Sequence, residues 1–316
     1  MDEITLYGSS LKDLINRSYQ CFSNGDFEES EEVLEKALSI DFDDNEVQAA
    51  LKCSHFWVTR KQRLDLISEP YDSGEYLLKE WRVFKSFLRS FNEVFERCTM
   101  SIQRWVFGSA LNAYKNIQRN NEELDREILF QIGRCYKGIG DYENALSLIE
   151  MASQRKREDP EIIAELADVY ALINEMKASK IFFREAFFID PQGIDLVFLE
   201  SEMILRLIRR LEDMGMDSST LPEWIPVYGV VFGVFNVKRE LKTLEYGKLR
   251  QSIYSLENEV KAGTGNRENQ TIPRLLNRYF WLIDHYMITN ETRFRIEEIL
   301  DKIKVLNNSI FEQYIQ

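Results

Sequence analysis

The sequence predicts an all-α protein. Helix-breaking residues are scarce, apolar residues recur at helical spacing, and two segments resemble each other when shifted along the chain. Of the 316 residues only 6 are Pro and 14 are Gly, whereas 44% are hydrophobic. This composition favours long helices over many short strands joined by turns, and the length allows a substantial buried core.

Residues 11–44 are predicted to form the first helix pair, a divergent copy of the repeat that is clearest further along the chain. Leu14, Leu34 and Ala37 mark its apolar positions, and Gly25-Asp26-Phe27 lies between the two amphipathic stretches.

Between residues 45 and 125 the apolar spacing predicts helices over 45–67 and 77–100 and from Trp105 to Ile117. The segment SEPYDSGEY separates the first two and carries the Pro and Gly that break helices. An insertion between repeats is therefore predicted near residues 66–76.

The clearest helix pairs lie in residues 126–193, where two segments align with each other. Tyr136 aligns with Tyr170, and Ala152 aligns with Ala186, so the offset is 34 residues in both cases (170 − 136 and 186 − 152). Because this register holds over a whole helix pair, the segment reads as two consecutive structural repeats.

The residue types in these repeats suit closely packed helix pairs. Small residues such as Gly133 and Ala145 let two helices approach, while large residues fill the space between neighbouring pairs. Gly140 can take the positive φ that ends a helix, and Asp141 can cap the next one. Pro191 stops the last helix because its nitrogen carries no hydrogen.

These segments resemble the tetratricopeptide repeat (TPR) family. The matching residues are Leu129, Ile132-Gly133, Tyr136, Gly140-Asp141-Tyr142, Ala145, Ile149 and Ala152 in the first unit and Ile163, Leu166-Ala167, Tyr170, Phe183, Ala186 and Pro191 in the second. The resemblance implies an α-solenoid, a right-handed superhelix of antiparallel helix pairs, with a C-terminal helical extension or cap.

Beyond Gly193 the repeat pattern is lost, but helical spacing continues. Further amphipathic helices are predicted over 194–213, 249–260, 275–286 and 296–314. The loop AGTGNRENQTIP is the best candidate for disorder in the chain.

One stretch, WIPVYGVVFGVFNV at residues 224–237, carries no charge. As a helix it would span about 21 Å, less than the roughly 30 Å of bilayer hydrocarbon, so a membrane span is disfavoured. Burial inside the C-terminal helices is the favoured interpretation. An apolar partner-binding surface stays open, with Trp224, Tyr228 and Phe232 as its candidate residues.

The resulting domain division has four parts. Residues 1–10 form an N-terminal arm, 11–125 hold TPR and degenerate TPR-like pairs, 126–193 hold two clear TPR units, and 194–316 form a helical region that continues or caps the solenoid.

Charge and cysteine usage restrict the partners and the compartment. The net charge of −13 disfavours binding to a phosphate backbone, so no nucleic-acid partner is expected. The 4 cysteines are widely spaced and are therefore predicted to be reduced thiols. Without a visible signal peptide or transmembrane segment, a cytoplasmic location is expected. The sequence sets no oligomeric state.

Catalytic, cofactor and metal sites are not expected. The 2 histidines lie outside any spaced Cys/His cluster, and Cys53-x-His55 offers at most two ligands, so packing is favoured over zinc binding. Gly138-x-Gly140 lacks the Lys-Ser or Lys-Thr of a phosphate loop and is better explained as a helix-ending turn. No cofactor is implied.

The resemblance to TPR proteins implies a concave groove, lined by the first helix of each pair, that receives a peptide or helix of a partner protein. Transferring the groove positions one by one gives the candidate partner-binding residues Ile15, Tyr19, Phe22, Phe130, Arg134, Lys137, Ala164, Asp168 and Ala171. The leading hypothesis is a non-catalytic protein–protein interaction scaffold or adaptor.

Two alternatives from other functional classes remain open. One is a helical enzyme or regulatory subunit with a small-molecule site in the C-terminal half, which convergent carboxylates in a pocket would favour. The other is a self-associating structural subunit of a larger assembly. The fold class alone does not distinguish between these hypotheses.

Overall fold

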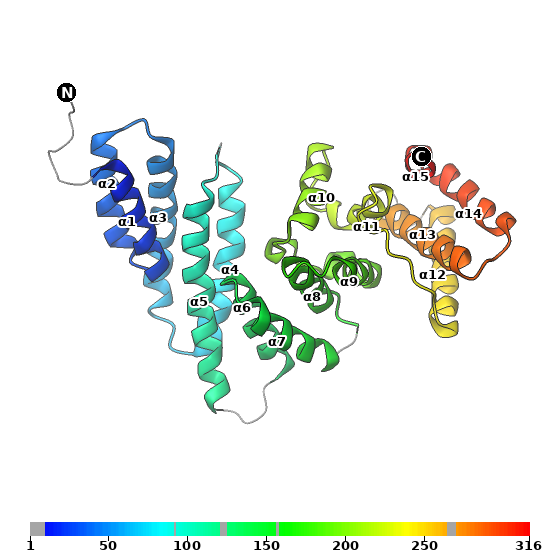
Figure 1. Ribbon diagram of the computed structural model, residues 1–316, viewed down its shortest axis with the longest axis horizontal. Helices are drawn as coiled ribbons and strands as arrows, with labels where there is room; N and C mark the ends of the chain where they lie inside the picture. The colour runs from blue at the N-terminus through cyan, green and yellow to red at the C-terminus, as the bar shows by residue number, and fades with distance from the viewer. Residues whose placement is uncertain (1–9, 92, 121–124, 156–157, 264–269) are drawn as a thin grey trace. The chain divides into compact units, whose positions relative to one another are not determined.

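The computed structural model describes residues 10–91, 93–120, 125–155, 158–263 and 270–316. They form helices and connecting segments, and no strand occurs among them. The chain divides into two compact units, Met1–Ala152 and Ser153–Gln316, here called the N-terminal and C-terminal units. Figure 1 labels the helices of each unit along the chain.

The N-terminal unit is built from consecutive helices. They are α1 (Leu11–Asn24), α2 (Phe27–Ile40), α3 (Asn45–Leu64), α4 (Pro70–Leu88), α5 (Glu96–Asn120), α6 (Arg126–Gly138) and most of α7 (Tyr142–Arg155).

An aromatic cluster joins α2, α3, α4 and α5 in the core of this unit. The ring of Trp57 lies 5.4 Å from those of Phe84 and Trp105 and 6.1 Å from that of Phe27, measured between centroids. Trp57 is fully buried. Because buried aromatic side chains contribute large apolar areas, this cluster fixes how the four helices pack.

The turns within the helix pairs follow the predicted chemistry. Gly25 and Gly140 have φ of 82° and 86°, the left-handed conformation that ends a helix. Asn174 takes the equivalent place in the next pair with φ of 66°. Gly133 allows α6 and α7 to approach, because a Cβ on it would lie 2.6 Å from the side chain of Ile149.

The C-terminal unit contains the remaining helices. They are α8 (Pro160–Leu172), α9 (Met176–Ile189), the short 3₁₀ turns η1 (Pro191–Gly193) and η2 (Leu196–Phe198), α10 (Glu202–Asp213), α11 (Leu221–Val231), α12 (Thr243–Ala262), α13 (Ile272–Ile288), α14 (Arg293–Leu306) and α15 (Asn308–Ile315). Helix α13 is the central element, since α11, α12 and α14 all pack against it.

Three predicted helices have different bounds in the structure. The helix predicted over 77–100 is divided: α4 begins at Pro70, where proline suits the first helical turn, and ends at Leu88. Gly74 lies within α4, and the ring of Tyr114 packs closely against it. The single helix predicted over 296–314 is interrupted at Asn307, whose side chain accepts a hydrogen bond from the Ile310 N–H at 3.0 Å.

The third difference concerns residues 194–213, where the helix begins only at Glu202. Asp195 first caps the short turn η2 by accepting a hydrogen bond from the Val197 N–H at 3.1 Å. Residues 264–269 of the predicted disordered loop lie outside the described residues, whereas Ile272 and Pro273 at its end belong to α13.

The uncharged stretch 224–237 forms the end of α11 and the turn that follows it. Ile225, Val227 and Phe235 are buried in the core of the C-terminal unit, whereas Trp224 and Phe232 are half-buried. Among the described residues, no helix combines the length and apolar content needed to cross a membrane. The favoured interpretation, burial among the C-terminal helices, agrees with this placement.

Packing at Gly229 gives a testable prediction. A Cβ there would lie 2.3 Å from the ring of Phe235, so Gly229→Ala should destabilise the C-terminal unit by about 1–3 kcal/mol through overpacking. The matched control is Gly247→Ala in α12, where a Cβ meets no neighbour and should stabilise by about 0.5–1 kcal/mol. Amide exchange in α11, followed as urea unfolds the protein, measures the change in unfolding free energy for both variants. Equal changes for Gly229→Ala and Gly247→Ala would contradict this packing.

Candidate partner-binding surface

The C-terminal unit has a surface pocket between the end of α8, the start of α9, α10 and the turn after α11. Its volume is about 620 Å³. The lining residues are Ala171, Leu172, Met176, Ser201, Glu202, Met203, Arg206, Leu207, Arg210, Phe232 and Val234. The pocket therefore combines an apolar lining with charged groups from α10.

Helix α10 is positioned by the buried carboxylate of Asp168 on α8. Its two oxygens accept hydrogen bonds from the backbone N–H groups of Glu200 and Ser201, each at 2.8 Å. A carboxylate at a helix N-terminus satisfies unpaired N–H groups and interacts favourably with the helix dipole. Asp168 thus connects the last repeat helix pair to α10.

The sequence of α10 is strongly amphipathic, and this sets its two faces. Ile204, Leu207, Ile208 and Leu211 are buried against the core. The arginines of the opposite face are exposed, and two of them share one carboxylate: Arg206 and Arg209 lie 2.7 and 2.8 Å from Glu202. Exposed ion pairs of this kind stabilise little.

The turn after α11 forms the other wall of the pocket. Gly233 has φ of 69°, which lets the chain reverse, and the Phe235 N–H donates to the Gly229 carbonyl at 2.7 Å. Phe235 packs on the rings of Phe183 and Phe187, with centroids 6.3 and 6.1 Å away. This anchoring holds Phe232 and Val234 at the pocket.

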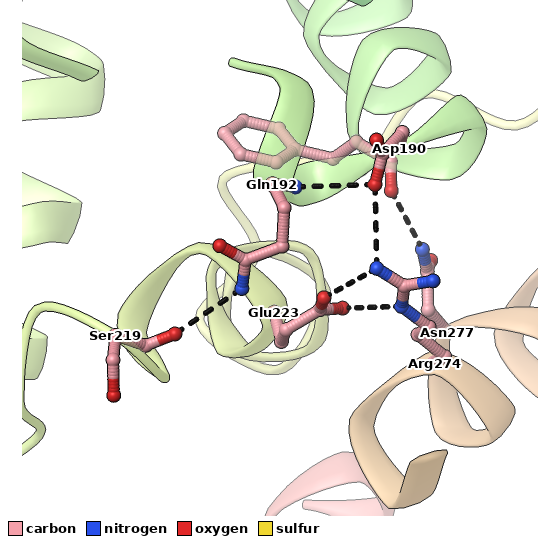
Figure 2. Close-up of polar contacts among 7 residues, drawn as sticks. Asp190, Gln192, Ser219, Glu223, Arg274 and Asn277 are labelled. Atoms are coloured by element: carbon pink, nitrogen blue, oxygen red, sulfur yellow. Dashed lines mark hydrogen bonds and ion pairs between the residues drawn. The ribbon is translucent and has the colours of Figure 1, made fainter. Parts of the chain in front are cut away.

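An ion pair between a buried carboxylate and a half-buried arginine fixes α11 itself. Figure 2 shows Arg274 of α13 reaching Glu223 of α11 and Asp190 at the end of α9. Arg274 donates two hydrogen bonds to Glu223, at 2.6 and 2.9 Å, and one to Asp190 at 3.3 Å. The Glu223 carboxylate is fully buried, and these hydrogen bonds raise the pKa of Arg274.

Two further hydrogen bonds surround this ion pair (Figure 2). Gln192 donates its side-chain N–H to the Ser219 carbonyl at 3.1 Å, and Asn277 donates to the Phe187 carbonyl at 3.4 Å. The first joins the segments before and after α10 to each other, and the second joins α13 to α9.

The structure brings two of the sequence-predicted binding residues together. Ala171, predicted for the groove, and Phe232, predicted for the second surface, both line the pocket. Trp224 is half-buried and Tyr228 is buried, and their rings lie 5.8 Å apart outside the pocket lining.

The groove candidates of the first repeat lie in the core of the N-terminal unit. Ile15, Tyr19 and Phe22 are buried. Burial raises the pKa of Tyr19, and its hydroxyl donates to Glu46 at 2.7 Å. A partner could reach these side chains only by displacing neighbouring helices.

Helix α5 accounts for this burial, because it packs along α1. Arg97 of α5 donates to Asn16 at 2.7 Å and lies 5.6 Å from the ring centre of Tyr19. Trp105 of α5 packs closely against the turn at Gly25. Placement of α5 on α1 cannot be deduced from the repeat pattern alone.

The remaining groove candidates are also buried. On α6, Phe130, Arg134 and Lys137 are buried, and the Arg134 guanidinium lies 4.4 Å from the ring centre of Phe130. On α8, Ala164 and Asp168 are buried, and Asp168 accepts hydrogen bonds from the Glu200 and Ser201 N–H groups just before α10. Contact of these side chains with a partner stays a prediction.

The lining residues that sequence reasoning missed are Met176, Met203, Arg206 and Arg210. A signal was present, since the run from Glu202 to Asp213 alternates apolar and arginine residues at helical spacing in an acidic chain. The described lining of the pocket has one carboxylate, that of Glu202. It does not bring together the several carboxylates that would favour an enzyme.

The candidate metal ligands make other contacts. His55 lies 3.4 Å from Glu31, and His285 accepts a hydrogen bond from the Leu241 N–H at 3.2 Å. Within the part of the chain that the structure describes, no three His, Cys, Asp or Glu side chains are grouped to hold a metal ion.

Comparison with known families supports the repeat assignment. Two tetratricopeptide repeat models match the chain, one over residues 14–44 and one over residues 128–164. The first covers most of α1 and α2, and the second covers most of α6, all of α7 and the start of α8. No curated protein matches the chain. The predicted TPR resemblance and the all-α fold are confirmed.

The Glu223–Arg274 pair gives a second prediction. Arg274→Met leaves a fully buried carboxylate without its cation and should cost about 3–5 kcal/mol of unfolding free energy in the C-terminal unit. Replacing both residues, as Glu223→Gln with Arg274→Met, should recover much of this loss. Arg293→Met is the control, since Arg293 is 92% exposed and its pair with Glu297 stabilises little.

Urea unfolding followed by amide exchange in α11 and α13 measures these changes. A cost for Arg274→Met no larger than that of Arg293→Met would contradict a structural role for the buried pair.

Proposed function

We propose that this chain, which carries tetratricopeptide repeats, is a non-catalytic interaction scaffold or adaptor that binds a segment of a partner protein in the pocket of its C-terminal unit. The repeats themselves suggest a role in protein–protein interaction. The pocket supplies what such a role needs, namely an apolar lining on a positioned backbone and polar groups at the rim.

The observation that carries the proposal is the convergence of Ala171 and Phe232 on one pocket. They come from the two surfaces that the sequence singled out independently. Met176 and Met203 add flexible, polarisable side chains that adapt to a ligand's shape.

The proposal places the interaction in a reducing compartment such as the cytoplasm. The supporting observation is that Cys21, Cys53, Cys98 and Cys135 are all free and buried. Thiols with this placement suit packing and need no oxidising environment.

Affinity capture from native lysate tests the proposed surface. Met203→Glu introduces a charge into the apolar lining and should lower recovery of the bound protein at least tenfold, a loss of about 1.4 kcal/mol in binding free energy. Met214→Glu is the matched control, because Met214 is exposed and lies outside the pocket lining.

Amide exchange of both variants, measured beforehand, verifies that α8 to α11 stay folded. Equal recovery by the wild type and by Met203→Glu would place the interaction elsewhere on the chain and contradict the proposal.

A further inference from the structure

We infer that the ligand of this pocket is an acidic amphipathic peptide segment, whose apolar side chains enter the pocket and whose carboxylate binds Arg210. The inference rests on the function proposed above and adds the chemistry of the partner segment. It is carried by the geometry of Arg210, by the charge of the pocket lining and by its apolar side chains.

Arg210 differs from the other arginines of α10. Its guanidinium carbon lies 3.5 Å from the ring centre of Phe232. Among the described residues, its guanidinium makes no hydrogen bond or ion pair, whereas Arg206 and Arg209 are both engaged with Glu202. Stacking restrains the side chain while its N–H groups point outward in the plane of the guanidinium.

A restrained guanidinium of this kind is suited to a carboxylate. Two parallel N–H groups can bind both carboxylate oxygens, and less side-chain entropy is lost because Phe232 already limits the orientation of Arg210. The stacked pair also lies at the pocket rim, so a bound carboxylate stays next to the apolar lining.

The local charge distinguishes this surface from the chain as a whole. The charged side chains of the pocket lining are Glu202, Arg206 and Arg210, a local charge of +1 (2 − 1), whereas the chain carries −13. An acidic segment is therefore attracted to the pocket lining and repelled by the average surface. Such complementarity governs orientation and partner choice.

The apolar lining excludes a ligand that is merely acidic. Met176, Met203, Phe232 and Val234 offer no charge to a polar peptide. Their burial stabilises a complex only if the ligand supplies apolar side chains of its own. The segment therefore needs apolar residues on one face with Asp or Glu beside them.

Fluorescence anisotropy with short labelled helical peptides tests the inference on the full chain. The first probe carries leucines on one face with glutamates beside them. In the second, lysines replace the glutamates, and in the third, serines replace the leucines. We expect the first probe to bind the wild type at least tenfold more tightly than either of the others.

A charge reversal separates a specific carboxylate contact from general attraction. Arg210→Glu should lower the affinity for the leucine–glutamate probe at least tenfold and raise the affinity for the leucine–lysine probe. The control Arg293→Glu reverses an exposed arginine of α14 outside the pocket and should leave both affinities within twofold.

The outcomes distinguish failure of the inference from failure of the proposed function. Equal binding of the two leucine probes, both lost in Met203→Glu, overturns the acidic preference and retains the pocket. If the serine probe binds as tightly as the leucine–glutamate probe, the requirement for apolar side chains is overturned. If neither leucine probe binds, the inference is overturned, and unchanged capture by Met203→Glu then overturns the proposed function too.

Discussion

The candidate surface depends on the hydrogen bonds between the Asp168 carboxylate and the backbone at Glu200 and Ser201. The TPR-like pair α8 and α9 ends at Ile189, and the chain then passes through two short 3₁₀ turns before α10 begins. The Glu200 and Ser201 N–H groups lie just before α10, and without Asp168 they would be unpaired, although Ser201 is buried. The same carboxylate therefore fixes the segment that leads into α10 and so sets one wall of the pocket.

The opposite wall is held by different forces. The buried Glu223 carboxylate and the half-buried Arg274 connect α11 to α13 through a hydrogen-bonded ion pair, and Phe235 anchors the following turn in the apolar core. The pocket thus lies between two walls that are fixed separately. This restrains the lining before a ligand arrives, and a restrained site loses less conformational entropy on binding. The methionines in the lining keep enough freedom to adapt to different side chains.

Much of the fold could be predicted because local chemistry determines it. The turns at Gly25 and Gly140 and the helix end before Pro191 all follow from properties of the residues at those positions. The start of α10 could not be predicted, because the segment that leads into it is held by Asp168, far away along the chain. Asn307 differs, since it interrupts a stretch with continuous helical spacing through a local cap on the Ile310 N–H, which apolar spacing alone does not reveal.

The candidate site was predictable only in part, for a related physical reason. Helical spacing shows which face of a helix is apolar, but it does not show which neighbour covers that face. Tyr19 and Phe22 have the residue types of a binding groove, yet α5 packs along α1 and they belong to the core. Phe232 could be predicted from the apolar stretch that contains it. Arg210 could not, because its orientation depends on stacking against the Phe232 ring, which the sequence does not show.

Site-specific photo-crosslinking is the most direct test of whether partners bind at the pocket of the C-terminal unit. A photoreactive phenylalanine derivative replaces Met203 in the pocket or, as a control, the exposed Tyr254 on α12, and each chain is irradiated in native lysate. We expect a covalent adduct with a partner protein from position 203 and none from position 254. Adducts from position 254 with none from position 203 would contradict it.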